Sequence, residues 1–503
     1  MALLTVAERT GYRATSTHAE VMAYIGELAA LGRGRLVVTS FGSTPLGREL
    51  PLLVLSSGGV SSPEQARARN KPVVLILCCI HAGEVEGKEA ALMLSRDLLQ
   101  GPDHGLLEQL TLVVVPIFNA DGNDAMDPGH RALRIERLKG QNGPHTSGTR
   151  VNAAGINLNR DYIRQETLEM RLLQQHVCQR WAPDLCIDTH ATNGSVHRFA
   201  MTFDVPHTVD SGRREPVDYM RRVFVPEVSA AVKKRAGFDS GWYGNFVEDE
   251  RVLDRDGTAD PSSAVGEGWM TYPHHPRFGS NYRGLTSRLD LLLECYSYLG
   301  FEERVHTTYA WLLESLRAAG RRAAEIVELL RSCEAAPAHV AVGYRLEAMP
   351  EPVEVLTRAP RTLDGSPTST KMPFLARFVG DVVIERPRGY IVPGRLGPFF
   401  RGHGLAPVAA PPSARVARAT LESLGAVGGR AILEASGVGQ RGVSWAAASE
   451  RLPTDALLIT TEQRLGALAV YLCEPESDDG LVEAGLSPTP AVGATFEVMR
   501  WLG

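Results

Sequence analysis

Three short, largely apolar stretches, each ending on or next to a side chain that can bind a metal or move a proton, constrain the fold of this chain most. Val73 to Ile80 leads into His81, Asp184 to His190 ends on a histidine, and Arg288 to Glu294 ends on a glutamate. Such runs between polar residues are typical of buried strands. In open α/β sheets, sites gather at the carboxyl ends of the strands. We therefore expect these side chains to meet at one edge of a sheet.

Two of these stretches supply the ligands of a candidate metal site. His81-Ala-Gly-Glu84 places a histidine and a glutamate three residues apart, and His190 adds a second imidazole. Two nitrogens and one carboxylate suit Zn²⁺, and three protein ligands leave a position open for water and substrate, whereas structural zinc sites usually fill all four. The sequence therefore predicts one catalytic zinc per chain, held by His81, Glu84 and His190. The alternative is an ordinary turn after a buried strand.

Further residues provide chemistry that a metal alone does not. Asn159 and Arg160, in the segment Gly155-Ile-Asn-Leu-Asn-Arg-Asp-Tyr162, place an amide beside a guanidinium, which is suited to gripping a carboxylate in a bidentate fork. Glu294 is the candidate general base. The alternative for Glu294 is a strand-end carboxylate paired with Arg288.

The order and content of these motifs resemble the zinc carboxypeptidases of the carboxypeptidase A type, over roughly the first two thirds of the chain. Two plainer landmarks agree with this resemblance. Phe41 to Arg48, followed by Leu52 to Leu55, resembles the early hairpin of that family, and Asn119-Ala-Asp-Gly122 resembles its Asn-Pro-Asp-Gly turn. The resemblance implies an α/β three-layer sandwich around a central mixed, mostly parallel twisted sheet.

The resemblance also implies roles for individual residues. The three predicted ligands would hold zinc, Asn159 and Arg160 would bind the terminal carboxylate of the substrate, and Glu294 would activate water. The chain departs from the family at Asn157, where an aspartate commonly supports a zinc histidine. A neutral amide would orient that imidazole with less electrostatic help.

The arginine that polarises the scissile carbonyl is harder to place, because four arginines follow the Asn-Ala-Asp-Gly turn. We assign the role to Arg137, since the segment Glu136 to Gly143 best resembles the arginine-centred segment of the family. Arg131, Arg134 and Arg150 are the alternatives. For any single member of this cluster, the competing interpretation is a solvated basic loop.

A tyrosine that closes over the substrate is also expected from the family. Tyr282 is our candidate, and Tyr272 is equally in range before Glu294. The stretch Thr271 to Asn281 is punctuated by proline and glycine, which indicates a loop of uncertain register. His274 and His275 are interpreted as loop histidines rather than ligands.

These expectations combine into one functional hypothesis and two alternatives. The chain would be a metallocarboxypeptidase, a zinc-dependent hydrolase that removes a C-terminal residue from a peptide by zinc-activated water and a glutamate base. The first alternative is a zinc-dependent amidase or deacylase that acts on N-acyl amino acids or modified peptides. The second is a non-catalytic peptide-binding relative. The expected partner is a peptide or amide substrate with a free carboxylate.

Composition excludes several other classes of function. A net charge of -5 gives no reason to expect nucleic acid or an anionic membrane as a partner. No apolar run is long enough to cross a bilayer. Met1 to Ala30 lacks the pattern of a secretory signal, which favours a cytoplasmic protein, with export of a longer precursor as the alternative. The seven cysteines are odd in number and lie mostly in apolar segments, so we expect buried, reduced thiols.

Periodicity and punctuation suggest two domains. Residues 1–335 would form the catalytic domain, with an insertion at about 196–270, and residues 336–503 a smaller α+β or mostly β domain that resembles the extension of some bacterial relatives. Helices are expected at His18 to Leu31, Glu84 to Leu99 and Glu166 to Trp181. In the second domain, strands are expected at Val382 to Ile384 and Ala467 to Leu472.

Overall fold

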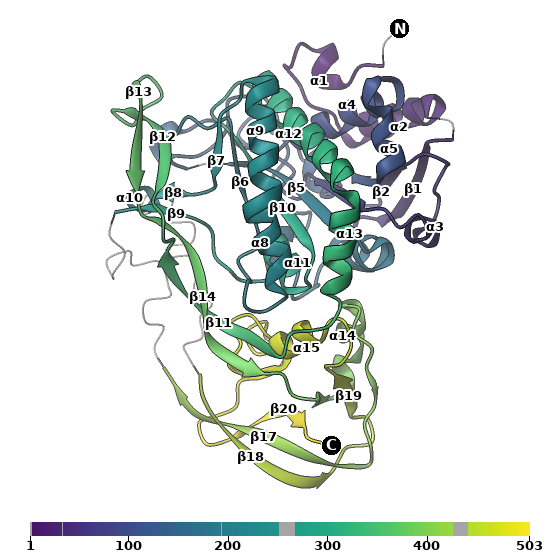
Figure 1. Ribbon diagram of the computed structural model, residues 1–503, viewed down its shortest axis with the longest axis vertical. Coiled ribbons are helices and arrows are strands. Elements are labelled where there is room, and N and C mark those ends of the chain that lie inside the picture. Colours follow the sequence, from purple (N-terminus) through teal and green to yellow (C-terminus); the bar gives the residue numbers. More distant parts are fainter. Residues whose placement is uncertain (1–2, 33, 193, 251–266, 426–440) are drawn as a thin grey trace.

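A computed structural model gives the structure of residues 3–32, 34–192, 194–250, 267–425 and 441–503. Its largest element is an eight-stranded sheet with strand order β1-β2-β4-β3-β5-β10-β6-β7 (Figure 1). The strands of this sheet are β1 (Leu36–Ser43), β2 (Glu49–Leu55), β3 (Val73–Cys78), β4 (Thr111–Val115), β5 (Leu185–Thr192), β6 (Met201–Asp204), β7 (Ser240–Trp242) and β10 (Leu289–Tyr296). Part of the expected insertion, residues 251–266, lies outside the described residues.

The centre of the sheet is parallel and its edges are mixed. Strands β4, β3, β5 and β10 run in the same direction, whereas β1 and β2 form an antiparallel hairpin and β6 is antiparallel to β10. Every residue of β3, β4 and β5 is buried. Parallel strands that are covered on both faces are continuous apolar runs. The mixed, mostly parallel sheet expected from the sequence is therefore confirmed.

Helices cover both faces of the sheet. Successive side chains of a strand point to opposite faces. Cys78 Sγ of β3 lies 3.4 Å from the carbonyl oxygen of Gly87, in α4 (Glu86–Gln100). Leu75, on the other face of β3, lines a cavity together with Cys178, in η4 (Leu173–Gln179). The helices α4 and η4 therefore lie on opposite faces, and the three-layer arrangement is confirmed.

The helices of this region follow the sequence pattern closely. Predicted and observed bounds agree for α2 (His18–Leu31), where the side chains of Thr17 and Glu20 form a capping box that fixes the first turn. On the α4 side, α4 contacts α12 (Phe301–Arg321), and α12 contacts α9 (Val225–Ala236) (Figure 1). Other helices of this region are α7 (Leu168–Leu172), α8 (Arg214–Tyr219), η5 (Met220–Phe224), α11 (Gly279–Leu285) and α13 (Ala323–Ser332).

After α13 the chain enters a region rich in strands. A hairpin of β12 and β13 projects from it, and a six-stranded sheet has the order β16-β19-β15-β20-β17-β18. The strands are β11 (His339–Ala348), β12 (Val353–Ala359), β13 (Ser366–Met372), β14 (Phe374–Glu385), β15 (Gly389–Val392), β16 (Val408–Ala409), β17 (Ser413–Leu424), β18 (Arg441–Arg451), β19 (Leu457–Thr460) and β20 (Thr495–Trp501). This β-rich region is the additional C-terminal part expected from the sequence.

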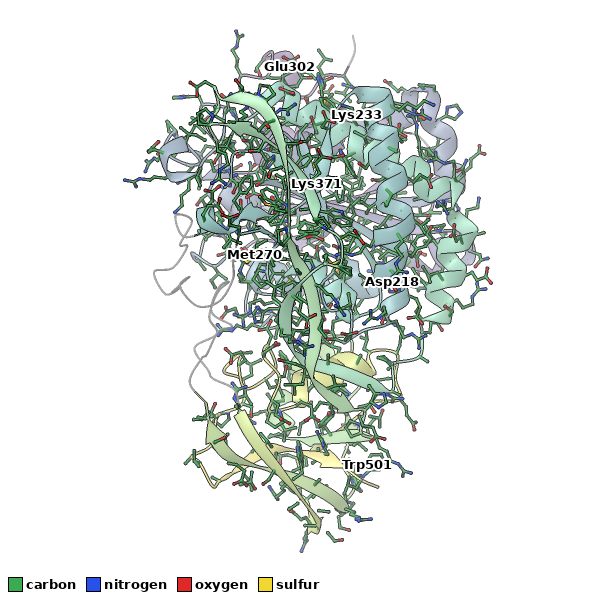
Figure 2. The ribbon with its side chains drawn as sticks, turned by 60° about the vertical axis from the view of Figure 1, so that its left-hand side comes forward. Asp218, Lys233, Met270, Glu302, Lys371 and Trp501 are labelled. Carbon is green, nitrogen blue, oxygen red and sulfur yellow. The ribbon has the colours of Figure 1, made fainter. Side chains whose placement is uncertain are left out.

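The two parts of the chain share a sheet. Strand β14 pairs in parallel with β9 (Trp269–Met270), which comes from the expected insertion, and β9 pairs with β8 (Asn245–Phe246). Figure 2 shows Met270 beside the strands that descend from the hairpin of Lys371 toward the lower sheet, which ends near Trp501. The C-terminal region is therefore tied directly to the segment that precedes Tyr272.

One expected strand of the C-terminal region is wrong. Ala467 to Leu472 lies in a helix, α15 (Gly466–Cys473), and every residue of α15 is buried. When every residue of a short run is buried, apolar and polar residues do not alternate along the sequence, so the pattern does not distinguish a helix from a strand. Val382 to Ile384, by contrast, lies in β14 as expected.

All seven cysteines are free, and all except Cys178 are buried, as expected from the sequence. Among the described residues, no helix combines the length and apolar composition needed to cross a membrane.

Candidate active site

The three apolar strands bring their terminal side chains to one edge of the sheet. After β3 the chain turns through Cys79, whose φ is 60°, and presents His81 and Glu84 just before α4 begins. His190 lies near the end of β5, and Glu294 is its direct register partner on β10. The two side chains lie side by side on neighbouring strands, as the sequence predicts.

His81, Glu84 and His190 form a compact tripod. His81 Nδ1 lies 3.3 Å from Glu84 Oε1, His190 Nδ1 lies 3.1 Å from Glu84 Oε2, and the two Nδ1 atoms are 3.2 Å apart. Ligands bound at 2.0–2.2 Å in a tetrahedral zinc site are about 3.3 Å from one another. All three side chains are buried. The donor set and its spacing therefore fit a zinc ion.

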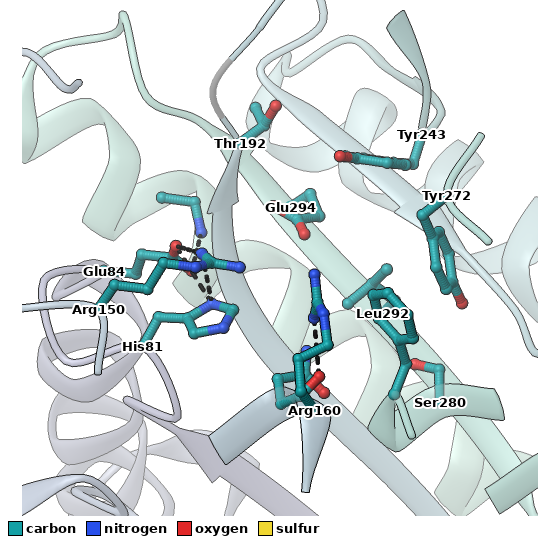
Figure 3. A pocket seen from close by; sticks show the side chains of 13 residues that line it. His81, Glu84, Arg150, Arg160, Thr192, Tyr243, Tyr272, Ser280, Leu292 and Glu294 are labelled. Atoms are coloured by element: carbon teal, nitrogen blue, oxygen red, sulfur yellow. Dashed lines mark hydrogen bonds and ion pairs between the residues drawn. The ribbon is translucent and has the colours of Figure 1, made fainter. Parts of the chain in front are cut away.

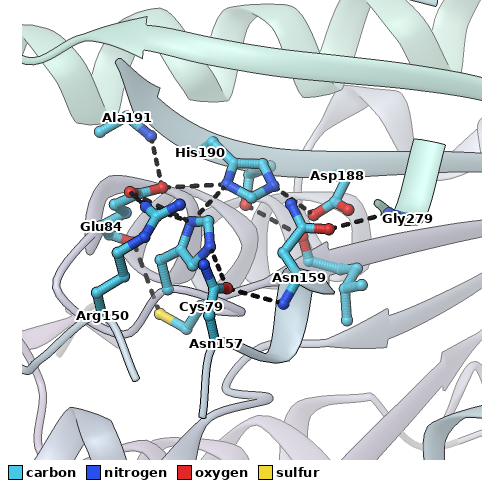
Figure 4. A network of polar contacts seen from close by, with 12 residues as sticks. Cys79, Glu84, Arg150, Asn157, Asn159, Asp188, His190, Ala191 and Gly279 are labelled. Carbon is cyan, nitrogen blue, oxygen red and sulfur yellow. Dashed lines mark hydrogen bonds and ion pairs between the residues drawn. The ribbon is translucent and has the colours of Figure 1, made fainter. Parts of the chain in front are cut away.

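A hydrogen bond behind His81 and an ion pair behind His190 orient the Nδ1 atom of each ring toward this centre (Figure 4). Asn157 Oδ1 lies 3.0 Å from His81 Nε2, and Asp188 Oδ1 lies 3.2 Å from His190 Nε2. Acceptors at these positions place the ring proton on Nε2 and leave Nδ1 as the ligand atom. Asn157 thus lies where the resemblance places the supporting residue, but with an amide instead of a carboxylate.

The charges around the tripod favour a neutral imidazole at one ligand and a carboxylate at another. Burial, and then the charge of Arg150, lower the pKa of His81 to about 3. Burial alone would raise the pKa of Glu84, but His81, Arg131 and His190 hold it well below its usual value. For His81 and Glu84 these are the protonation states that metal binding requires. Burial alone would lower the pKa of His190, but Asp188 outweighs this effect and raises that pKa, so metal binding there would release a proton.

Two arginines of the loop after the Asn-Ala-Asp-Gly segment reach the tripod, and Arg137 is not one of them. Arg131 donates to Glu84 Oε1 at 3.0 Å, and Arg150 donates to the same oxygen at 3.4 Å. Arg137 ends the short helix η2 (Ile135–Arg137), is exposed, and does not line the cavity; Arg134 is also exposed. The resemblance of the segment Glu136 to Gly143 to the family therefore did not identify the arginine that faces the site.

A cavity opens beside the tripod, and its lining joins most of the predicted site residues (Figure 3). Asn159 and Arg160, which end the short helix η3 (Leu158–Arg160), lie on its wall together with Glu294. The guanidinium carbon of Arg160 lies 3.8 Å from the centre of the Phe278 ring. The lining residues are His81, Glu84, Arg150, Asn159, Arg160, Ala191, Thr192, Tyr243, Tyr272, Phe278, Ser280, Leu292 and Glu294.

The tyrosines of the cavity are Tyr243 and Tyr272. Tyr282 is buried in α11, where its hydroxyl lies 2.7 Å from His403 Nδ1, and it does not line the cavity. In Figure 3 the hydroxyl of Tyr243 points toward Thr192 and Glu294, whereas the hydroxyl of Tyr272 points away from them. The helix α11 begins at Gly279, so it carries Tyr282 into the interior.

Comparison with known families agrees with this geometry. Residues 21–190 match the family model described as zinc carboxypeptidase. Over this segment the chain is similar to the zinc carboxypeptidases. The matched range includes His81, Glu84, Asn159, Arg160 and His190, and it ends at His190, so Glu294 lies outside it. The match supports a hydrolytic enzyme.

Several solved structures are distantly similar. The metallo-carboxypeptidase of Burkholderia cenocepacia is 17% identical, with 61% of this chain and 70% of that chain covered and a TM-score of 0.42. A metallo-carboxypeptidase from Pseudomonas aeruginosa is 17% identical over 61% and 69%, with a TM-score of 0.39. The carboxypeptidase A of Helicoverpa armigera is 14% identical over 61% and 74%, with a TM-score of 0.38. A search of curated proteins gives no match.

The region behind the tripod also contains a buried network that the sequence interpretation missed. Arg283 donates to Asp188 Oδ2 at 2.8 Å and to the Tyr162 hydroxyl at 3.1 Å, and it also contacts Asp290. Asp188 in turn contacts His190. The signal was present, because residues two apart on a strand share a face and Asp188 precedes His190 by two. The partner Arg283, on α11, has no such local signal.

Proposed function

We propose that the chain is a zinc-dependent carboxypeptidase that removes the C-terminal residue of a peptide. The observation that carries this proposal is that a single cavity is lined by the zinc ligands His81 and Glu84, the carboxylate of Glu294, and the amide and guanidinium of Asn159 and Arg160. A centre that can activate water and a pair of side chains that can bind a carboxylate therefore share the same cavity.

The residues around the cavity divide the work of hydrolysis. When zinc is bound it supplies Lewis acidity, which lowers the pKa of water and polarises a carbonyl. Glu294 accepts the proton of the attacking water on its carboxylate and passes it to the leaving nitrogen. Arg160 and Asn159 hold the terminal carboxylate, so that the last peptide bond lies beside Glu294. His81, Glu84 and His190 hold the metal.

We assign stabilisation of the developing oxyanion to Arg150 in place of Arg137. Arg150 lines the cavity and lies 3.1 Å from His81 Nδ1, whereas Arg137 is exposed. Arg150→Ala is expected to lower kcat by about 10²- to 10³-fold, the usual cost of removing an oxyanion donor. Arg137→Ala is the matched control and should leave kcat within about twofold. Steady-state kinetics on one peptide would show the difference, and the reverse ranking would contradict the assignment.

The grip on the carboxylate distinguishes a carboxypeptidase from a general amidase. Two peptides of the same sequence, one with a free C-terminal carboxylate and one amidated, should differ by at least about 100-fold in kcat/KM, because a buried charge-assisted contact is lost. Arg160→Ala should remove most of this preference by weakening the reaction of the free peptide. Equal rates for the two peptides in the native enzyme would point instead to an amidase or deacylase.

The free thiols of the cysteines favour a reducing compartment as the location of this activity. The seven cysteines are free, and six are buried. Free thiols persist in reducing compartments. We therefore retain the cytoplasm as the proposed site of action.

A further inference from the structure

One segment of the cavity wall has no regular secondary structure. Residues 272–278 connect β9 to α11 and contribute Tyr272 and Phe278 to the cavity. A segment outside helices and sheets is held by side-chain contacts rather than by a backbone ladder. The position of this part of the wall therefore depends on what contacts it.

Two adjacent carboxylates of the C-terminal region supply those contacts. His274 Nε2 donates to Asp478 Oδ2 at 2.6 Å. Arg277 donates to Asp479 twice: its backbone N–H bonds Oδ2 at 2.7 Å, and its Nε bonds Oδ1 at 2.9 Å. Asp478 and Asp479 are more than 200 positions away in sequence from their partners' segment and follow α15.

These contacts are shielded from water and anchored. The side chains of Asp478 and Asp479 are only 12% and 4% exposed. Asp478 also accepts from the Tyr471 hydroxyl at 2.5 Å, and its backbone N–H donates to the carbonyl of Val342 in β11 at 2.9 Å. Removing one partner of a buried ion pair leaves an uncompensated charge, so such pairs resist separation.

The anchored segment continues directly into the proposed carboxylate grip. Arg277 is followed by Phe278, whose ring lies under the guanidinium of Arg160. The next backbone N–H, that of Gly279, donates to Asn159 Oδ1 at 2.9 Å. A displacement of Arg277 would therefore move the two contacts that orient Asn159 and Arg160.

We propose that Asp478 and Asp479 are positioning residues for substrate binding: they hold residues 272–278 so that Phe278 and Gly279 keep Arg160 and Asn159 in place. This inference rests on the proposed role of Arg160 and Asn159 in binding the terminal carboxylate. It gives the C-terminal region a function in the reaction without contact to the substrate.

A metal ion is the competing occupant of this junction, because ligand atoms of His274, His275 and Asp478 lie within 4.8 Å of one another. The direct contact is favoured, since His274 Nε2 already lies at the distance of a charge-assisted hydrogen bond from Asp478. A second zinc equivalent per chain that is lost in Asp478→Asn would overturn the direct contact.

The test compares Asp479→Ala with Glu462→Ala in the full-length, zinc-loaded protein. Glu462 is an exposed carboxylate of the same region, and it makes no ion pair within the described part of the chain. Asp479→Ala should raise KM for a peptide with a free C-terminal carboxylate by about tenfold and change kcat by less than about threefold, because the grip is displaced while the metal and Glu294 stay. Asp479→Asn, which keeps an oxygen for the Arg277 N–H, should raise KM less.

Hydrogen–deuterium exchange of residues 272–278 without substrate gives a readout that does not depend on activity. Asp479→Ala should accelerate this exchange, and Glu462→Ala should not. Unchanged exchange, or faster exchange with an unchanged KM, would overturn the inference. If the native protein released no C-terminal residue, the proposed function would fail, while faster exchange in Asp479→Ala would still support the hold on the segment.

Discussion

Replacing Glu294 by glutamine is expected to lower the rate of peptide hydrolysis by about 10³- to 10⁴-fold, which is the upper range for loss of a general base. The amide has nearly the same shape as the carboxylate, but it does not take a proton from water. Glu294 lies on the cavity wall and is not a member of the buried His81, Glu84, His190 tripod. Zinc content should therefore remain at one equivalent per chain, as measured by atomic absorption.

The control for this substitution is Glu302→Gln, on the exposed first turn of α12, which should leave the rate unchanged. Loss of zinc in Glu294→Gln would show that Glu294 supports the metal rather than the proton transfer. Unchanged turnover with zinc bound would refute its role as base.

The second large effect is expected from His190→Ala. His190 Nδ1 faces both other ligands, so its loss should weaken zinc binding by well over the 10- to 100-fold seen when only a supporting hydrogen-bond partner is removed. Peptide hydrolysis by His190→Ala should be undetectable when less than one zinc ion per chain is supplied. Competition of zinc with a chromophoric chelator would give the affinity. The control is the zinc affinity of His104→Ala. His104 is an exposed histidine whose ring contacts the Gly101 carbonyl.

The result would be ambiguous if His190→Ala unfolded the protein, because Asp188 would lose a buried partner. Circular dichroism of the metal-free variant settles this. A folded variant that binds zinc as tightly as the native protein would remove His190 from the ligand set.

The sheet and the tripod could be predicted because the signals are local and physical. Strands β3, β5 and β10 are buried on both faces, so their sequences are continuous apolar runs with polar ends. A parallel sheet brings those ends together without any further information. Glu294 and His190 are register partners for this reason.

The arginine and the tyrosine of the cavity could not be selected in the same way. Arg131, Arg134, Arg137 and Arg150 lie in a loop whose path is set by tertiary contacts, and only the structure separates Arg150 from the exposed Arg137. Tyr282 was a candidate by spacing alone, but the start of α11 buries it. Tyr243 comes from the insertion, where no motif pointed to it.

Contacts between segments that are far apart in the chain could not be predicted from the sequence either. The acidic stretch that contains Asp478 and Asp479 has the composition of a solvated turn, yet Asp479 is buried against Arg277, and the side chain of Asp478, beside His274, is only 12% exposed. Charge pattern identifies such residues as polar but does not identify their partners. The prediction of a strand at Ala467 to Leu472, which lies in the preceding helix α15, was also wrong. Every residue of α15 is buried, so the sequence lacks the regularly spaced polar residues that mark a helix.

We propose that zinc held by this tripod drives release of a C-terminal residue. The most direct test is to measure the zinc content of the purified protein together with the amino acids released from a mixed library of peptides with free C-termini. We expect one zinc per chain and release of C-terminal residues that stops when the metal is removed and returns when zinc is added. Stoichiometric zinc without any released amino acid would contradict the carboxypeptidase, and absence of zinc binding would contradict the site itself.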